Sequence, residues 1–377
     1  MWDIYERVLF KFLLYYQLRK ILYMIQGIKE FYTPLELLNL YYSNGQCGGN
    51  RRNKLWQKMN SLLSWDNLLN HGYQWDLCPL LFFIISKALP KINNSILQQD
   101  QGKTCPKSIS SKLQEYYQRS LIRNMILVDE LKRIVLELKE NNIEVATLKG
   151  GFLAENVYKD IACRPMGDLD ILIKDKDKEK CYKILLNMGY ENVVESAQIQ
   201  MLHRSFCKKV RMMPVNIEIH HYLVKEVFIP KFNVENVFFD KNIPLEYNLI
   251  YLSCHGIRHG LYRFLWLCDL AEIIKNNKEL INWDKAYKKS IDYNIQKQFL
   301  FTMHLTTILL LPTFSGMSNF SYKYLLPYIS ELLFIRIQKK ILNHADEKRL
   351  RHLLSICMMK ISDLKAFFQR YIQYRKM

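Results

Sequence analysis

Hydrophobic positions in the first third of the chain follow the period of an α-helix. Polar, glycine-containing breaks at residues 44–53 and 98–111 divide this part into helical segments. After the second break, Ser110 or Ser111 is a suitable N-cap for a long helix that runs to about Glu140. Apolar side chains recur within it at three- and four-residue steps, which is the spacing of one helix face. They are Leu121, Met125, Val128, Leu131, Val135 and Leu138.

The period changes after residue 141. Val145–Leu148 is a short β-prone run, and the sequence Lys-Gly-Gly at residues 149–151 follows it before a helical pattern resumes. Leu169, Ile171 and Ile173 then alternate with their neighbours, which is the two-residue period of a strand. The pattern therefore predicts a strand, a glycine turn, a helix and a second strand.

Further elements are expected in the same segment. Residues 177–188 have a helical pattern that Gly189 would close, and residues 210–213 and 215–220 are expected as two strands around Pro214. From Tyr247 onward the spacing is helical again, almost to the end. We therefore predict an α+β protein whose small mixed β-sheet is flanked by N- and C-terminal helical segments. The expected parts are a helical region over residues 1–140, an α/β core over 141–222 and a helical region with a basic tail over 223–377.

Composition agrees with a helix-rich globular chain. Glycine contributes 13 of 377 residues, which is low for an average protein, and apolar residues make up 49%. The chain contains no run of about 20 mostly apolar residues, so we expect no membrane span. The N-terminus lacks the pattern of a secretory signal, and the nine cysteines have no paired spacing. We expect a cytoplasmic protein with reduced thiols.

The chain is strongly basic. Lys and Arg number 54 against 36 Asp and Glu, a formal net charge of +18. A positive field favours acidic partners such as nucleotides, nucleic acid or anionic lipid. The same charge also raises solubility without any partner, so charge leaves both interpretations open.

Two acids in the second predicted strand are the main candidate for chemistry. Asp168 and Asp170 are two residues apart, so a strand would present both carboxylates on one face, opposite Leu169 and Ile171. Neighbouring carboxylates repel each other unless a cation lies between them. Mg²⁺ prefers a few carboxylate oxygens together with substrate phosphates. The alternative is a pair of exposed acids on an edge strand.

Two further features add to this candidate. Gly150 and Gly151, behind Lys149, stand between a strand and a helix, where backbone N–H groups can approach a phosphate. Glu218 lies in a later alternating run and could bring a third carboxylate beside the pair. The alternatives are an ordinary strand-to-helix turn and a partly exposed glutamate on an edge strand.

The order of these elements resembles the DNA polymerase β-like nucleotidyltransferase superfamily. Within it, the chain is similar to the bacterial "uncharacterised nucleotidyltransferase" family over about residues 60–275. The core of the resemblance is Leu148-Lys149-Gly150, Leu153-Ala154, Tyr158, Arg164-Pro165 and the stretch from Asp168 to Ile173. More distant matching positions are Trp65-Asp66, Cys78-Pro79, Asn124, Glu218-Ile219-His220, His255, His259, Arg263, Trp266 and Asp269.

The resemblance implies an enzyme of nucleotidyltransferase fold that holds two Mg²⁺ (or Mn²⁺) ions and uses both in phosphoryl transfer. Such an enzyme moves a nucleoside monophosphate from an NTP, by default ATP, to an acceptor and releases pyrophosphate. Asp168, Asp170 and Glu218 would be the catalytic metal ligands, and Gly150 and Gly151 would bind phosphate. Lys149 and Arg164 are placed to offset the charge of the triphosphate.

This chain departs from the superfamily pattern at two positions. It has Gly150-Gly151 where Gly-Ser is usual, and a glutamate, Glu218, where aspartate is common. A serine hydroxyl that would bind the terminal phosphate is therefore absent, which leaves a weak or inactive enzyme open.

Several alternatives remain at this stage. The acceptor is open between a small molecule, a protein and an RNA, and the chain could instead be an inactive nucleotide-binding module or a helical interaction protein. Arg164 could form a structural ion pair with Asp168 or Glu218. His255 and His259 share a predicted helix face, so a zinc site is conceivable. His220 could orient an acceptor, and Arg263 and Asp269 could close the wall of the active site.

Overall fold

The computed structural model describes residues 37–38, 41–42, 64–88, 105–193, 203–221, 243–258, 263–277 and 279–311. The polar break at residues 44–53, His259 and the basic tail lie outside these residues. The division into three parts at residues 140 and 222 therefore stays a prediction.

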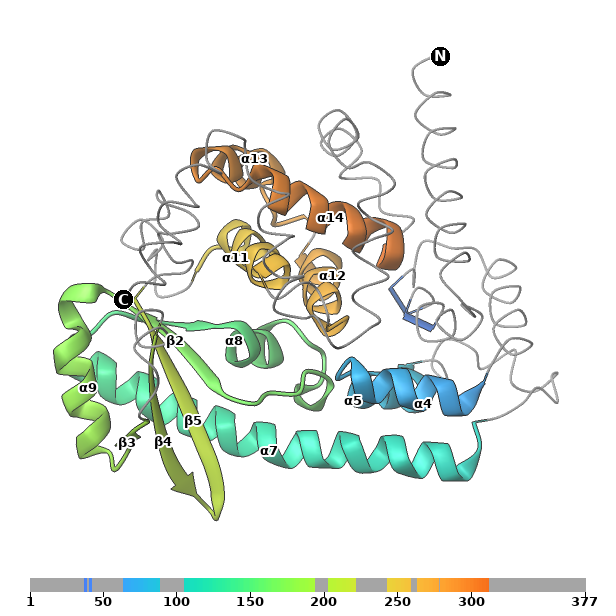
Figure 1. Cartoon of the computed structure of the whole chain (residues 1–377), viewed down its shortest axis with the longest axis horizontal. Coiled ribbons are helices and arrows are strands. Elements are labelled where there is room, and N and C mark those ends of the chain that lie inside the picture. The colour runs from blue at the N-terminus through green and yellow to red at the C-terminus, as the bar shows by residue number, and fades with distance from the viewer. Residues whose placement is uncertain are drawn as a thin grey trace, which may run out of the picture.

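The described structure contains a five-stranded mixed sheet, which is drawn toward the left of Figure 1. The strands are β1 (Val145–Leu148), β2 (Leu169–Ile173), β3 (Glu191–Asn192), β4 (His203–Val210) and β5 (Met213–His220). Their order is β1-β2-β5-β4-β3, and the pair β2–β5 is parallel while the other pairs are antiparallel. The prediction of an α+β fold with a small mixed sheet is confirmed.

The sheet has an apolar core on each face. Leu169, Ile171 and Ile173 of β2 pack with Ile217 and Ile219 of β5 in one core. Helices α7 (Lys107–Glu140) and α9 (Lys178–Asn187) cover this face and contribute apolar side chains to the same core. On the other face, Leu172 and Leu148 belong to a second core, which includes the C-terminal helices. The alternation along β2 therefore sends its odd-numbered residues to α7 and its even-numbered residues to the opposite face.

Helices complete the layers on both sides of the sheet (Figure 1). Helix α8 (Lys149–Asn156) follows β1 and lies on the same side of the sheet as the C-terminal group. That group comprises α11 (Leu245–Arg258), α12 (Leu265–Asn277), α13 (Trp283–Asp292) and α14 (Gln296–Leu310). Before α7, the described residues form α4 (Trp65–Gln74), α5 (Cys78–Phe83) and the π-helix η1 (Ile84–Ala88). None of the helices described is long and apolar enough to cross a membrane.

The expected strand over residues 210–213 is wrong. Val210 ends β4 and Met213 begins β5, and Arg211 and Met212 form the hairpin turn between them, in the left-handed region at φ 47° and 65°. Pro214 lies inside β5 opposite Lys209, next to the hairpin pair Val210↔Met213. Proline is tolerated there because the N–H group that it lacks would not take part in the hydrogen bonds of the sheet. Pairing with β2 begins only at Ile217, so no ladder bond is lost at Pro214.

The helix expected over residues 177–188 is confirmed as α9, with Gly189 at φ 84° after its last turn. The long helix α7 begins at Lys107, a few residues before the predicted Ser110 or Ser111. Pro106 precedes it, and proline is common where a helix begins. No side chain accepts a capping hydrogen bond at the N-terminus of this helix, because its N-cap residue is Pro106.

Candidate active site around Asp170

The candidate site lies on the face of the sheet that carries the even-numbered residues of β2. Asp170 is paired with Glu218 of the parallel strand β5 and with Leu148 of the antiparallel strand β1. Because parallel strands in register align residue by residue, the carboxylates of Asp170 and Glu218 project side by side. Lys149 follows Leu148 directly, so its side chain begins beside the same two acids.

These side chains form a compact charged cluster. The Lys149 ammonium forms an ion pair with Asp170 and lies 3.8 Å from Glu218 Oε2. His220, two residues after Glu218 on the same face, places Nε2 2.8 Å from Asp170 Oδ1 and 3.4 Å from Glu218 Oε2. One donor atom each from Asp170, Glu218 and His220 lies within 4.8 Å of the other two. Two carboxylates and an imidazole at this spacing fit a single divalent cation.

The charges of the cluster stabilise one another. Burial opposes ionisation of Asp170, but the Lys149 charge and a hydrogen bond from His220 hold its pKa well below the usual range. Burial likewise opposes the charge of Lys149, yet the carboxylates of Asp170 and Glu218 raise its pKa overall. The pKa of Glu218 is lowered because the hydrogen bond from His220 and the Lys149 charge outweigh burial. Asp170 and Glu218 are therefore ionised at neutral pH, and Lys149 supplies the compensating charge.

Asp168 lies just outside this compact group. The strand begins at Leu169, so the part of the prediction that placed Asp168 inside the strand is wrong, and this residue occupies the preceding bend. Burial, followed by the charges of Asp170 and Glu218, raises the pKa of Asp168 to about 6. Its carboxyl group is close enough to sense both acids, and its role as a metal ligand stays a prediction.

The glycine turn after β1 is confirmed as a structural feature. Lys149 has φ 45°, in the left-handed region, and begins helix α8. A Cβ added to Gly150 would lie 2.9 Å from Met166 Cγ, and one added to Gly151 would lie 2.8 Å from Leu131 Cδ2. Both contacts are shorter than real Cβ atoms tolerate, so a side chain at either position would require the Met166 or the Leu131 side chain to move. Phosphate binding by this turn stays a prediction.

Arg164 has a different partner from those the sequence suggested. Its Nε and Nη2 donate to the two carboxylate oxygens of Asp269 in α12, at 2.9 and 3.0 Å. Tyr158 donates to the same carboxylate at 2.8 Å, and Arg164 Nη1 donates to the Pro165 carbonyl. The structure therefore pairs Arg164 with Asp269, whereas the sequence suggested Asp168 or Glu218. Binding of triphosphate by Arg164 is not tested by this geometry.

Side chains of α7 hold the loop that leads to Asp168. Arg123 donates to the carbonyl groups of Met166 and Gly167 at 2.9 and 2.7 Å. Asn124 is fully buried, and its Nδ2 donates to the carbonyls of Ile161 and Arg164 at 2.6 and 2.8 Å. The sequence placed Asn124 on a long helix but gave no sign of these contacts. A buried polar residue on an otherwise apolar helix face was the available signal.

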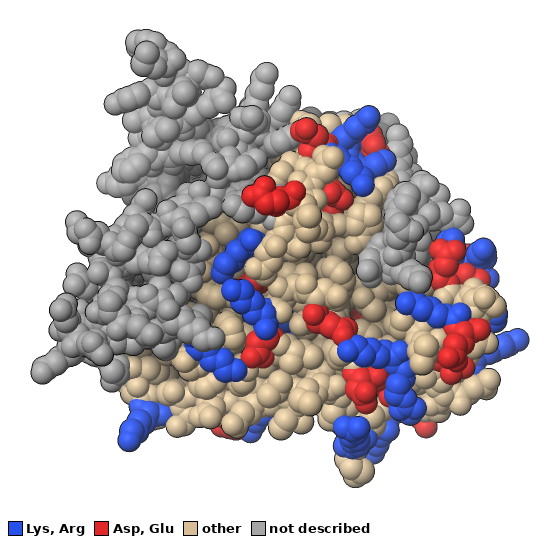
Figure 2. Space-filling view, turned by 180° about the vertical axis from the view of Figure 1, so that it is seen from behind, with Lys and Arg blue, Asp and Glu red and all other residues tan. Residues whose placement is uncertain are grey.

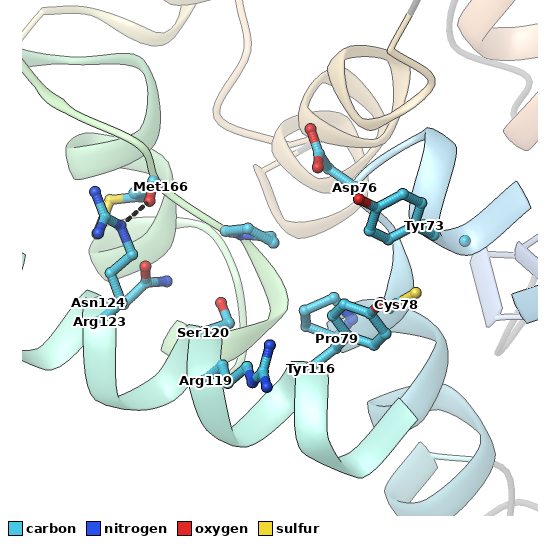
Figure 3. Close-up of a pocket in the computed structure, with 12 residues that line it drawn as sticks. Tyr73, Asp76, Cys78, Pro79, Tyr116, Arg119, Ser120, Arg123, Asn124 and Met166 are labelled. Carbon is cyan, nitrogen blue, oxygen red and sulfur yellow. Dashed lines mark hydrogen bonds between the residues drawn. The ribbon is translucent and has the colours of Figure 1, made fainter. Parts of the chain in front are cut away.

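A pocket of about 220 Å³ lies beside this loop (Figure 3). Tyr116, Arg119 and Ser120 of α7 line one side, and Tyr73 and Asp76 line the opposite side. Met166 lines it as well, and the same side chain packs against Gly150. Met166 therefore separates the pocket from the glycine turn.

The other histidines and charged residues of the C-terminal helices lie elsewhere. His255 packs edge-on against Trp266, with ring centroids 5.3 Å apart, and Trp266 is buried. Among the described residues, the group spaced to hold a metal contains His220 and not His255. Arg263 forms an ion pair with Asp76 at 3.3 Å. The zinc alternative therefore has no support from His255, and His259 is outside the described residues.

Charged side chains are mixed on the surface. Figure 2 shows Lys and Arg interspersed with Asp and Glu over one face of the described part of the chain. On this face the positive net charge is not gathered into one continuous basic stripe, which an extended nucleic-acid interface would need.

Comparison with protein families identifies the class of this protein. The model of a family described as "uncharacterised nucleotidyltransferase" matches residues 86–310, more than half of the 377-residue chain. The chain belongs to this family, as the resemblance implied. The expected range was about residues 60–275. The match begins later, at residue 86, so it leaves out Trp65 and Cys78. It also ends later, at residue 310, which is the end of α14. Neither the search of curated proteins nor the search of solved structures gave a match.

Proposed function

We propose that the protein is a metal-dependent nucleotidyltransferase that moves a nucleoside monophosphate from an NTP, by default ATP, to an acceptor. The single observation that carries this proposal is the register of β2 and β5, which sets Asp170 beside Glu218. Both carboxylates project from the same face and stand next to the Lys149 ammonium. In the reaction, the acceptor atom bonds to the α-phosphorus, the bond to the bridging oxygen breaks, and pyrophosphate leaves.

Asp170 and Glu218 are the residues that would hold the metal ion, with Asp168 as a further ligand from the preceding bend. Their ionisation at neutral pH supports this assignment, because a cation binds the deprotonated carboxylate. A bound divalent cation would neutralise phosphate charge and make the acceptor group a better nucleophile.

Lys149 and the glycine turn would receive the triphosphate. Lys149 carries its charge at the start of α8, where backbone N–H groups also favour an anion. Glycine at positions 150 and 151 leaves the backbone uncovered by a Cβ. This turn would therefore bind phosphate oxygens through its backbone and the Lys149 ammonium.

Glu218 is the candidate base for the acceptor proton. Its carboxylate is half-buried, and it is the more exposed of the two paired acids, with 24% of its side chain accessible against 3% for Asp170. An acceptor approaching the site would meet Glu218 before Asp170. We assign removal of the acceptor proton to Glu218, and we assign to the more deeply buried Asp170 the role of metal ligand alone.

A nucleotide-binding module without catalysis is the second candidate. The observation that favours it is Gly151, which stands where the superfamily usually has serine and where an added Cβ would lie 2.8 Å from Leu131 Cδ2. Such a module would bind NTP at the same residues without releasing pyrophosphate.

Ligand-dependent stability of the purified chain tests the proposal. Melting would be followed with Mg²⁺ or Mn²⁺ plus each of the four NTPs, for the wild type, Asp170→Asn and Glu218→Gln. A ligand at about 100 times its dissociation constant stabilises the native state by about 2.7 kcal/mol. We expect a metal-dependent shift with one or more NTPs that both variants lose, and that Glu191→Gln on the exposed strand β3 retains.

Nucleotide turnover separates the two candidates. Pyrophosphate release with a mixture of candidate acceptors supports the enzyme, and NTP binding without release supports the module. Equal metal-dependent shifts in the wild type and Asp170→Asn would refute both.

A further inference from the structure

We infer that His220 is a nitrogen ligand of the metal ion. The site then combines an imidazole with the carboxylates of Asp170 and Glu218, and it prefers Mn²⁺ to Mg²⁺. This inference rests on the proposed function and concerns the same site. It adds a ligand to the three acids that the sequence pointed to.

The position of His220 follows from the strand that carries it. His220 is two residues after Glu218 on β5, so both side chains project from the same face. It pairs with Leu172, two residues after Asp170 on β2. The imidazole therefore lies one step further along the same two strands than the pair of carboxylates. It is also buried, with 6% of the residue accessible.

The same ring nitrogen faces both acids. His220 Nε2 lies 2.8 Å from Asp170 Oδ1 and 3.4 Å from Glu218 Oε2. Adjacent ligand atoms around an octahedral ion with bonds of about 2.1 Å are about 3.0 Å apart. The two distances bracket that value, and all three donor atoms lie within 4.8 Å of one another, so a single ion can contact all three after the side chains adjust.

Ligation requires a change of tautomer at His220. Without metal, Nε2–H donates its hydrogen to Asp170, since a carboxylate only accepts. With metal, the imidazole carries its proton on Nδ1, and the Nε2 lone pair is directed at the ion. The Lys149 ammonium, which shares Asp170, must then withdraw from the carboxylate that it neutralises.

The donor set determines which metals bind well. Carboxylate and water suit both Mg²⁺ and Mn²⁺, whereas imidazole suits the first-row divalent metals, a series in which Mn²⁺ is the weakest-binding member and to which Mg²⁺ does not belong. A site with one nitrogen beside the carboxylates of Asp170 and Glu218 should therefore bind Mn²⁺ more tightly than Mg²⁺. We expect a preference of about tenfold, and its reduction to about threefold or less in His220→Asn.

The neighbouring residue His221 provides a matched control. Its Nε2 lies 2.6 Å from the Tyr182 hydroxyl, away from the acids. Tyr182 packs against the core that α7 and α9 cover, which lies on the opposite face of the sheet from Asp170 and Glu218. His221→Asn therefore makes the same chemical change one residue away without altering the proposed ligand set.

Pulsed EPR of bound Mn²⁺ tests the inference by a readout that does not require catalysis. The full chain is freed of metal with a chelator, titrated with Mn²⁺, and examined for the ¹⁴N coupling of a directly bound imidazole. We expect the coupling in the wild type and in His221→Asn, and its absence in His220→Asn. Labelling the wild type with ¹⁵N-histidine should replace the ¹⁴N signal, which keeps the test informative should His220→Asn fail to fold.

The outcomes separate this inference from the proposed function. Mn²⁺ binding without nitrogen coupling, together with metal-dependent NTP turnover, would overturn the role of His220 and leave the transferase proposal standing. Coupling that persists in His220→Asn but disappears in His221→Asn would also overturn it. Failure of Mn²⁺ to bind, with or without NTP, would reject both.

Discussion

Arg164 and Asp269 form a bidentate ion pair inside the protein, although 105 positions separate them in the sequence. Asp269 is fully buried and Arg164 is 9% exposed. Burial alone would lower the pKa of Arg164, but the Asp269 carboxylate outweighs burial and raises it. The pair connects the loop that leads into β2 with helix α12. It therefore holds this loop, which carries Asp168, against the C-terminal helices.

Breaking this pair should cost much more stability than breaking an exposed one. Asp269→Asn leaves the Arg164 charge buried without a counter-charge, which typically costs about 3–5 kcal/mol. Asp76→Asn breaks the exposed pair with Arg263, in which both side chains are more than 40% accessible, and should cost less than about 1 kcal/mol. Urea unfolding of both variants measures the difference. Equal losses would show that the buried pair does not anchor the loop.

Lys149 occupies the position at which a metal ion would neutralise Asp170, so the two compete. Lys149→Met removes the competing charge and keeps the length of the side chain. We expect metal affinity to rise by about tenfold or more, since one unit charge a few ångströms away is worth several kcal/mol before screening. NTP affinity should fall in the same variant because the triphosphate loses a cation.

Calorimetric titration of Mn²⁺ and of an NTP checks both signs. Lys174→Met is the control, because Lys174 pairs with Glu144 at 2.9 Å, just beyond the opposite end of β2. Weaker metal binding in Lys149→Met would mean that Lys149 supports the metal site and does not compete with it.

Local sequence patterns predicted the part of the site that depends on local geometry. The alternation around Asp170 and Glu218 indicated strands, and the Lys-Gly-Gly sequence indicated a strand-to-helix turn. Both strands and the strand-to-helix turn are found, because the spacing of apolar residues and the residue types of a turn are properties of neighbouring residues. The order of these elements carried the resemblance, which then implied that they meet in one site.

Features that depend on distant parts of the chain were not predictable in this way. The partner of Arg164 is in α12, and no local pattern identifies Asp269 among the other acids. The hairpin turn at Arg211 and Met212 lacks the Asn or Gly that usually marks such turns, so a strand was expected there. The expected apolar face of α7 included Met125, which is 58% exposed, because the helix is covered only where the sheet and loop reach it.

The contact of Gly151 with Leu131 should prevent restoration of the superfamily serine. A Cβ at position 151 would meet Leu131 Cδ2 at 2.8 Å, and Leu131 is 2% exposed in the core of α7. We expect Gly151→Ser to destabilise the protein by about 1–3 kcal/mol, the usual cost of overpacking. It should not improve NTP binding. Thermal and urea unfolding, with an NTP titration, measure both effects.

A compensating change distinguishes overpacking from other costs of serine. Leu131→Ala removes the clashing atoms, so Gly151→Ser should be less destabilising when introduced into Leu131→Ala than into the wild type. A coupling of about 1 kcal/mol or more in this double-mutant cycle supports the contact. Strictly additive effects would show that the clash is relieved by backbone movement.

Asp168 should make the metal-free protein less stable as pH rises through the weakly acidic range. Its pKa is raised from 3.8 to about 6, first by burial and then by the charges of Asp170 and Glu218. The native state therefore binds the proton more tightly than the unfolded chain does. The stabilisation is complete below about pH 4 and is lost as pH rises through 6, by an amount of about 2–3 kcal/mol. His221 acts in the opposite direction, because burial lowers its pKa from 6.5 to about 4 and stability increases with pH between those values.

Variant differences separate these opposing contributions. With chelator present, the stability of Asp168→Asn relative to the wild type should increase between pH 4 and 6, whereas that of His221→Gln should decrease over a similar range. Saturating Mn²⁺ should reverse the first trend, because an ion bound near Asp168 favours its charged form and stabilises the wild type more than the variant. Urea unfolding at each pH measures all three curves. A difference for Asp168→Asn that stays constant with pH, with and without metal, would place Asp168 outside the charged cluster and remove it from the proposed ligand set.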